Sequence, residues 1–137
     1  MRAYLNGAFF NSFGQDKARI AETRITTNNN PWFGTQGGNA ANNRIFLLTL
    51  EEVAQYFGDS EQLLKNQPKD AYVINDQHNA ARIAAYESGK ASWWWLRSPG
   101  YSSAYAASVH RNGGVVVSGN SVSNYSGGVR PALWLKL

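Results

Sequence analysis

The sequence predicts an α+β fold, with helices in its first half and an antiparallel β-meander in its second half. One observation is the segment 49–57, where a capping box precedes an apolar helical pattern. A second is the change of sequence pattern after residue 91, where short apolar runs alternate with Pro-Gly, Asn-Gly and Gly-Gly pairs. Such pairs mark turns, and closely spaced turns between short strands are typical of a meander.

The chain has 137 residues, enough for a single domain over residues 1–137 with one hydrophobic core. Hydrophobic residues make up 43% of it and aromatic residues 13%, which disfavours intrinsic disorder because ample apolar surface is available for burial. Its apolar runs are far shorter than the roughly 20 residues that span a bilayer, so we expect no membrane insertion. The first seven residues lack the apolar stretch of a secretion signal, so either the protein is not exported by that route or the sequence begins inside a longer chain.

Only 16% of the residues are charged, and the net charge is +4 from 13 Lys and Arg against 9 Asp and Glu. The cations are dispersed along the chain without a basic run, so the sequence predicts no nucleic-acid partner. Cysteine is missing, which excludes disulfides, thiolate catalysis and cysteine zinc sites. Asn, Ser, Gly and Tyr are abundant where charged residues are few, and they are concentrated in particular stretches of the chain.

The N-terminal third is expected to hold two short helices and a long loop. Apolar residues at every fourth position from Leu5 predict a helix with one apolar face that ends at Gly14. A second helix is expected over residues 15–22. Residues 26–43 are polar and rich in Asn and Gly, and so long a loop in a small domain is typically functional or mobile.

The middle of the chain is expected to hold a buried strand over residues 44–48 and a helix over 50–57 that ends at Gly58. The capping box of this helix consists of Thr49 and Glu52, and its buried residues are expected to be Val53, Tyr56 and Phe57. Residues 71–74 favour a strand. Residues 80–86 fit either a helical turn or another strand.

An aromatic strand is expected over residues 92–100, closed by a Pro-Gly turn. Because side chains alternate along a strand, Trp94 must point to the opposite face from Trp93 and Trp95. The run therefore indicates a two-sided core, with at most one or two rings available for stacking on a sugar. We expect these residues and Trp134 to belong to a rigid scaffold.

The remainder of the chain is expected to continue the meander. Strands over residues 104–110 and 115–122 are joined at Asn112-Gly113, the strongest short hairpin signal available. A turn over 124–128 leads to a final strand over 129–135, whose proline belongs at its start or on an edge. If the hairpin turn has two residues, the facing pairs are Val109 with Val116 and Ser108 with Val117.

The inventory of catalytic side chains is sparse, so we predict no enzyme activity, metal or cofactor. His78 and His110 lie in different surroundings, and no zinc spacing, phosphate loop or nucleophile elbow occurs. The Asn75-Asp76 pair offers oxygen atoms that calcium prefers, but one short pair favours a turn. Arg97 and Arg130 follow apolar segments, and we expect them to pair with buried carboxylates or carbonyls.

Four blocks of the sequence resemble those of a known family, and they cover residues 5–9, 45–57, 94–100 and 128–134. The most specific motifs are Trp-Leu-Arg-Ser-Pro in the third block and Val-Arg-Pro-Ala in the fourth. Through them the chain resembles the bacterial and phage DUF6273 family over nearly its whole length. That family resembles the C-type-lectin-like fold of formylglycine-generating enzymes and of the variable proteins of diversity-generating retroelements. The resemblance implies N-terminal helices packed on a small, mostly antiparallel sheet, and a loop-rich face that displays ligand-binding residues.

The resemblance brings no catalytic or metal-binding residues with it. The oxidase branch of the fold uses cysteines, and this chain has none. The calcium-lectin triplets Glu-Pro-Asn and Trp-Asn-Asp are missing, as are the disulfides of animal lectins.

Polar and aromatic residues between the two most specific blocks form the candidate ligand-binding region, residues 101–126. They resemble the variable sites of retroelement target proteins, because randomising the adenines of an Asn codon yields mainly such residues. Tyr offers a large contact area with few torsions to freeze, and Ser and Asn offer adaptable hydrogen bonds. The alternative is an ordinary polar meander. The candidates are Tyr101, Ser102, Ser103, Tyr105, Ser108, His110, Arg111, Ser118, Asn120, Ser123, Tyr125 and Ser126.

These observations predict a non-enzymatic display module that binds a protein or glycan through residues 101–126, at a cell surface or on a phage particle as part of a larger protein. The alternative is a generic carbohydrate- or cell-wall-binding domain of a bacterial surface or phage protein. An enzyme of the formylglycine-generating type is disfavoured, because the chain has no cysteine and few histidines.

Overall fold

The computed structural model describes residues 1–61 and 63–137 in full and the backbone of residue 62. Its fold is mixed α+β, with short helices and several small antiparallel sheets. Among the described residues, no helix is long and apolar enough to cross a membrane. The elements in chain order are α1 (Arg2–Tyr4), η1 (Leu5–Phe9), η2 (Gly14–Arg19), β1 (Thr23–Ile25), β2 (Ala41–Asn43), β3 (Ile45–Phe46), α2 (Leu50–Phe57), α3 (Gln62–Lys65), β4 (Val73–Ile74), α4 (Asn79–Arg82), β5 (Ala84–Ala85), β6 (Ala91–Ser92), β7 (Trp94–Pro99), β8 (Tyr105–Val109), β9 (Val115–Ser121) and β10 (Ala132–Leu133).

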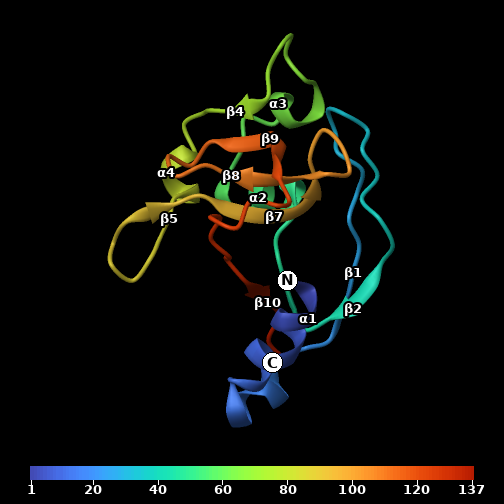
Figure 1. Ribbon diagram of the computed structural model, residues 1–137, viewed down its shortest axis with the longest axis vertical. Helices are drawn as coiled ribbons and strands as arrows, with labels where there is room; N and C mark the ends of the chain where they lie inside the picture. The colour runs from blue at the N-terminus through green and yellow to red at the C-terminus, as the bar shows by residue number, and fades with distance from the viewer.

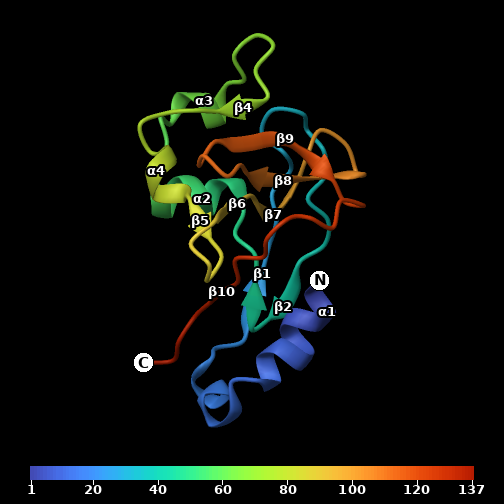
Figure 2. The same ribbon diagram turned by 60° about the vertical axis from the view of Figure 1, so that its left-hand side comes forward.

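The central sheet has four antiparallel strands in the order β4-β9-β8-β7, so the predicted meander is confirmed as β7-β8-β9. Figures 1 and 2 show α2, α3 and α4 in the same half of the molecule as this sheet, and α1, η2, β1, β2 and the C-terminus in the other half. The hydrophobic core lies between the sheet and α2. Its main members are Leu50, Val53, Ile74, Trp94, Leu96, Ala107, Val109, Val115 and Val117.

Helix α2 begins as predicted. The Oγ1 atom of Thr49 accepts a hydrogen bond from the Glu52 N–H at 3.1 Å, and the Glu52 carboxylate accepts one from the Thr49 N–H at 2.8 Å. Val53 is buried, but Tyr56 is 48% exposed, so its expected burial is wrong. Its ring lies edge-on to Trp134, which is itself half exposed, so neither ring joins the core.

The N-terminal helix is present but irregular, and it lies away from the central sheet. Its middle is a π-helical turn, in which Gly7 departs from helical geometry with φ −111° and ψ −105°. The Asn6 side chain hydrogen-bonds the backbone of Arg44 and Ile45, which docks the helix beside β3. Helix packing on the central sheet therefore comes from α2 and not from the first helices. The second predicted helix is the 3₁₀ helix η2.

The long loop is shorter than predicted, because its flanks form a pair of strands. Strands β1 and β2 pair antiparallel, with Ile25 opposite Ala41, and residues 26–40 connect them. The short polar segment of β2 carries no alternating pattern, so the sequence offered no strand signal there. Of the two alternatives for residues 80–86, both occur in succession, as α4 and β5.

The predicted hairpin register is wrong by one residue. Val109 faces Val115, and Ser108 faces Val116. The His110 N–H donates to the Gly114 carbonyl, the Gly113 N–H donates to the His110 carbonyl, and Gly113 has φ +86°. The connection is thus a three-residue loop with a glycine bulge and not a two-residue turn.

The remaining strand predictions hold in part. Trp94 is buried in the core, while Trp93 and Trp95 lie together on the opposite face with ring centroids 4.7 Å apart, as alternation requires. The final strand is reduced to β10, which follows Pro131. Trp134 is 49% exposed, so its expected place in the rigid scaffold is wrong.

Candidate ligand-binding surface

Three segments meet at one end of the central sheet. The loop 100–104 and the loop 121–127 are joined where the Val122 N–H donates to the Ala104 carbonyl at 3.0 Å. The segment 26–40 runs beside them, visible in Figures 1 and 2 as the blue-to-cyan chain next to the orange loop. This end of the sheet carries most of the predicted candidates.

Four aromatic rings form a row at this end, which we call the aromatic patch: Phe33, Tyr72, Tyr101 and Tyr105. Phe33 stacks on Tyr72 with an interplanar angle of 5° and centroids 6.4 Å apart, and it meets Tyr101 edge-on at the same distance. The rings of Tyr101 and Tyr105 are 4.3 Å apart. Tyr72 is 54% exposed and Tyr101 49%, so the row presents ring surface to solvent.

Backbone hydrogen bonds hold the tyrosines of the patch in place. The Tyr101 N–H donates to the Ser118 carbonyl at 2.9 Å, and the Gly100 N–H donates to the Tyr105 carbonyl at 2.7 Å. The Tyr72 carbonyl accepts from the Val117 N–H at 2.9 Å. A Cβ atom at residue 100 would collide with the Ser118 carbonyl, so the close approach of the two chains requires glycine there.

Phe33 reaches the patch through a buried asparagine. Asn30 is 2% exposed, and its amide donates to the carbonyls of Pro99 at 2.8 Å and Val117 at 2.9 Å. Its side-chain oxygen accepts from the N–H groups of Trp32 at 2.9 Å and Phe33 at 3.1 Å. The loop 26–40 is therefore held against the central sheet, and it contributes the Phe33 ring to the aromatic patch.

The structure gathers nine of the twelve candidates at this end. Tyr125 is 95% exposed, on a turn in which Asn124 accepts hydrogen bonds from Ser126. The nine are Tyr101, Ser102, Ser103, Tyr105, Ser118, Asn120, Ser123, Tyr125 and Ser126.

Three candidates lie elsewhere. His110 and Arg111 are exposed, but they occupy the hairpin loop at the far end of β8, about 13 Å away at roughly 3.3 Å per residue. Ser108 is fully buried and accepts a hydrogen bond from the Asn120 amide at 2.7 Å. It supports the sheet and is not available to a ligand.

Sequence reasoning missed two rings of the patch, Phe33 and Tyr72. Both lie far from residues 101–126 in the chain, and only tertiary packing brings them to the patch. The one available signal was the unusual length of the loop that carries Phe33.

The chemistry of this surface is that of phenols, hydroxyls and amides. The neighbouring Tyr105 phenol raises the pKa of Tyr101 above its ordinary value, so the Tyr101 phenol is neutral at ordinary pH. Among the described residues, no group of three His, Asp or Glu side chains is placed to hold a metal ion.

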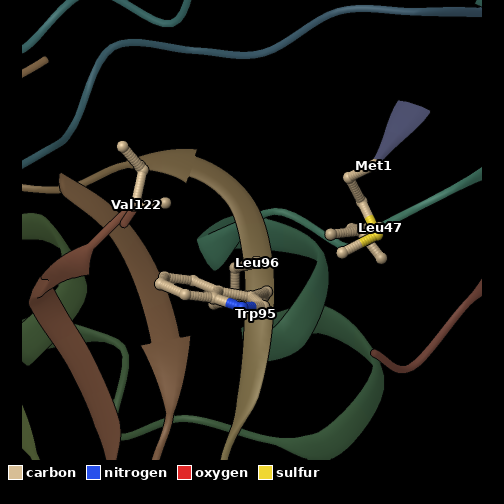
Figure 3. Close-up of a pocket in the computed structure, with 6 residues that line it drawn as sticks. Met1, Leu47, Trp95, Leu96 and Val122 are labelled. Carbon is tan, nitrogen blue, oxygen red and sulfur yellow. The ribbon is translucent and has the colours of Figure 1, made fainter. Parts of the chain in front are cut away.

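A mostly apolar pocket of about 210 Å³ borders the loop 121–127. In Figure 3 the Trp95 ring lies between Val122 on one side and Met1 with Leu47 on the other. The side chains that line the pocket are uncharged, like those of the aromatic patch.

The polar residues that the sequence singled out elsewhere have structural partners, with one exception. The Asp76 carboxylate lies 2.9 Å from the Arg82 guanidinium, and it also accepts from the His78 N–H, so its oxygens cap a turn. Arg97 donates to the carbonyls of Thr26 and Leu47, as predicted. The Nη1 atom of Arg130 is buried without a hydrogen-bond partner, and its guanidinium lies over the Phe57 and Trp94 rings, so the described residues do not show the predicted pairing there.

The comparison with protein families agrees with the resemblance seen in the sequence. The model of DUF6273, a domain of unknown function, matches residues 1–137, and the chain belongs to this family. No curated protein and no solved structure matches the chain.

Proposed function

We propose that this DUF6273 chain is a non-enzymatic binding module that contacts a protein or glycan through the aromatic patch and the adjoining loops 100–104 and 121–127. The observation that carries the proposal is the half exposure of Tyr72 and Tyr101 on a neutral surface. Exposed aromatic clusters of this kind, rimmed by hydroxyl and amide groups, mark interaction sites.

A rigid base under an adaptable rim favours this function. The strands beneath the patch bury Ala107, Val109 and Val117 completely, and Asn30 anchors the flanking loop. Tyrosine rings held on such a base bury a large area at low entropic cost, and the Ser and Asn side chains around them adapt to different partners.

We further propose that the domain has a C-type-lectin-like fold and is a variable protein of a diversity-generating retroelement. The α+β arrangement, with α2 against the antiparallel meander, and the Tyr, Ser and Asn content of residues 101–126 support this version. It predicts a template repeat near the 3′ end of the gene that matches the coding sequence except at adenines. Sequencing the surrounding DNA is the test, and a locus with neither a repeat nor a reverse transcriptase gene would refute this version alone.

A generic carbohydrate-binding domain is the second candidate, and the row of four rings favours it. Sugar rings place apolar C–H faces on aromatic side chains, and a neutral row suits a neutral saccharide. A glycan array tests this version. We expect Tyr101→Ala to abolish binding to any glycan that the chain captures, whereas Tyr56→Ala, which removes an equally exposed tyrosine outside the patch, leaves it unchanged. Equal loss in both variants, or none, would contradict a role for the patch.

A further inference from the structure

One turn of the chain carries the acceptor motif of N-linked glycosylation. Asn124-Tyr125-Ser126 fits the pattern Asn-x-Ser/Thr, in which x is any residue except proline. No other asparagine of the chain is followed two positions later by Ser or Thr. Because so short a pattern is common in proteins, the structure around the asparagine decides whether it can accept a sugar.

The motif lies where a transferase can reach it. All of residues 122–126 are exposed. The turn is nevertheless held at its C-terminal end, because Gly127 packs so closely against the Trp93 and Trp95 rings that a Cβ atom there would collide with both. The fold therefore presents Asn124 at the surface on a turn that is anchored to the indoles beneath it.

Hydrogen bonds within the turn prepare the Asn124 side chain for reaction. Its Oδ1 atom accepts from the Ser126 N–H at 3.0 Å and from the Ser126 hydroxyl at 2.8 Å. Two donors on the amide oxygen stabilise the negative charge that develops there when Nδ2 loses a proton, so they make the Nδ2 hydrogens more acidic. Among the described residues the Nδ2 atom has no hydrogen-bond acceptor, and the residue is exposed.

We propose that Asn124 is an acceptor for N-linked glycosylation. The donor is a saccharide whose anomeric carbon is esterified to phosphate, either a nucleotide sugar or a lipid-linked pyrophosphate sugar, and a glycosyltransferase brings it to the turn. The Nδ2 atom forms a bond to the anomeric carbon while the bond from that carbon to the phosphate oxygen breaks. The phosphate leaving group takes the electron pair of the broken bond, and a base of the transferase takes one Nδ2 proton. Nothing is oxidised or reduced.

This inference does not rest on the proposed function. Asn124 does not belong to the aromatic patch, and its modification is measured as a covalent gain in mass and not as ligand binding. A chain that accepts a sugar but binds no partner through the patch, or the reverse, separates the two proposals. The attached sugar would stand next to Tyr125 and so change the surface that the loop 121–127 presents.

The first test uses the full, folded chain without denaturant. One arm supplies UDP-glucose and a soluble N-glucosyltransferase that uses Asn-x-Ser/Thr acceptors. The other arm supplies a lipid-pyrophosphate-linked oligosaccharide and an oligosaccharyltransferase of the same acceptor specificity. Intact-mass measurement counts the saccharides added, and peptide mapping locates them.

We expect one saccharide per chain, attached to Asn124, in at least one arm, and the arm that succeeds identifies the class of donor. No modification in either arm would overturn the proposal. Modification that requires prior unfolding in urea would overturn it as well, because the folded turn would then not present the acceptor.

Variants of the turn provide the second test. Asn124→Gln keeps the amide but moves it by one carbon, and it should abolish modification. Ser126→Ala removes the hydroxyl donor and should slow modification at least about tenfold, whereas Ser126→Thr should restore it. Ser123→Ala, which removes an exposed hydroxyl of the same turn outside the motif, should be modified as fast as the unaltered chain. Undiminished modification of Ser126→Ala, or an equal loss in Ser123→Ala, would refute the role of the Ser126 hydroxyl and with it the proposal.

Discussion

Trp94 shows how a single side chain can join several parts of the core. It is 1% exposed, its ring meets Phe57 edge-on, and its indole N–H donates to the Arg82 carbonyl at 3.1 Å. Trp134, which the sequence placed in the same scaffold, is half exposed and touches Tyr56 alone among the aromatic rings.

We therefore expect the two tryptophans to differ strongly in stability measurements. Trp94→Ala should lower the free energy of unfolding by about 3–5 kcal/mol, because it leaves a cavity and removes the hydrogen-bond donor of the buried Arg82 carbonyl. Trp134→Ala should cost about 1 kcal/mol, since much of its area is already in water. Urea unfolding of both variants measures the difference, and equal costs would contradict the assignment of Trp94 to the core.

A second residue-scale feature is the ion pair beneath α4. Arg82 is completely buried, and the Asp76 side chain is 3% exposed. Burial raises the pKa of Asp76, but hydrogen bonds from Arg82 and the His78 N–H outweigh it, so the net shift is downward from 3.8. Nearby Asp59 has the opposite shift: burial and the charge of Asp76 raise its pKa, and its Oδ1 atom has no hydrogen-bond partner.

The two carboxylates should therefore respond oppositely to substitution. Asp76→Asn leaves Arg82 buried without a counter-charge and should cost about 3 kcal/mol at pH 7. Asp59→Asn should raise stability at pH 7, because it removes a carboxylate whose ionisation opposes folding. Its advantage should vanish as the pH falls below the unfolded-state pKa of 3.8, where Asp59 is protonated in both states. Thermal melts between pH 3 and 8 measure both effects, and a destabilised Asp59→Asn at neutral pH would contradict this account.

At the scale of elements, the Asn30 side chain ties the loop 26–40 to the central sheet. The Asn30 side chain makes four hydrogen bonds, two of them to carbonyls of the central sheet. Asn30→Ala should cost roughly 1–3 kcal/mol, since it leaves buried partners unsatisfied. It should also speed amide exchange around Phe33, because the loop loses its anchor. Asn29→Ala is the matched control, with one exposed hydrogen bond to the Gly37 N–H. Similar exchange in both variants would show that the loop is held by other contacts.

The β8–β9 hairpin illustrates which element properties a sequence can predict. The Asn-Gly pair correctly predicts a turn, and the valines predict both strands. The register depends on whether the turn has two or three residues, and the Asn-Gly pair is compatible with both lengths. Gly113 lies against the Asn79 backbone of α4, where a Cβ atom would collide with its carbonyl. The sequence of residues 110–114 alone does not indicate that Asn79 packs against this turn.

Two glycines with similar φ angles test how much the packing against α4 constrains this turn. Gly113 has φ +86° with the Asn79 backbone against it, and Gly89 has φ +82° with no atom within 4 Å of an added Cβ. Gly89→Ala should cost about 1 kcal/mol for the left-handed conformation alone. Gly113→Ala should cost about 1–3 kcal/mol more, because the hairpin must also move away from α4. Chemical denaturation compares them, and equal costs would show that packing against α4 does not constrain this turn.

At the scale of the whole molecule, local sequence pattern predicts the structure well, whereas contacts between segments far apart in the chain escape prediction. The capped helix α2, the meander and the opposite faces of Trp94 and its neighbours follow from local pattern, and the structure confirms them. The aromatic patch does not, because it unites residues from three distant segments. The burial of Ser108 and the separation of His110 and Arg111 from the other candidates likewise depend on tertiary placement.

The separation of a supporting scaffold from an exposed surface predicts how the whole molecule tolerates change. A combined variant with Tyr101→Ala, Ser103→Ala, Tyr125→Ala and Ser126→Ala alters four exposed positions at the candidate surface. Each should change stability by no more than about 0.5 kcal/mol, so the variant should fold and melt cooperatively close to the unaltered chain. Val117→Ala, a smaller change at a fully buried position beneath the same surface, should by itself cost at least as much. If the fourfold variant unfolds or loses its cooperative transition while Val117→Ala does not, the exposed residues are part of the scaffold, and a surface free to vary in sequence is ruled out.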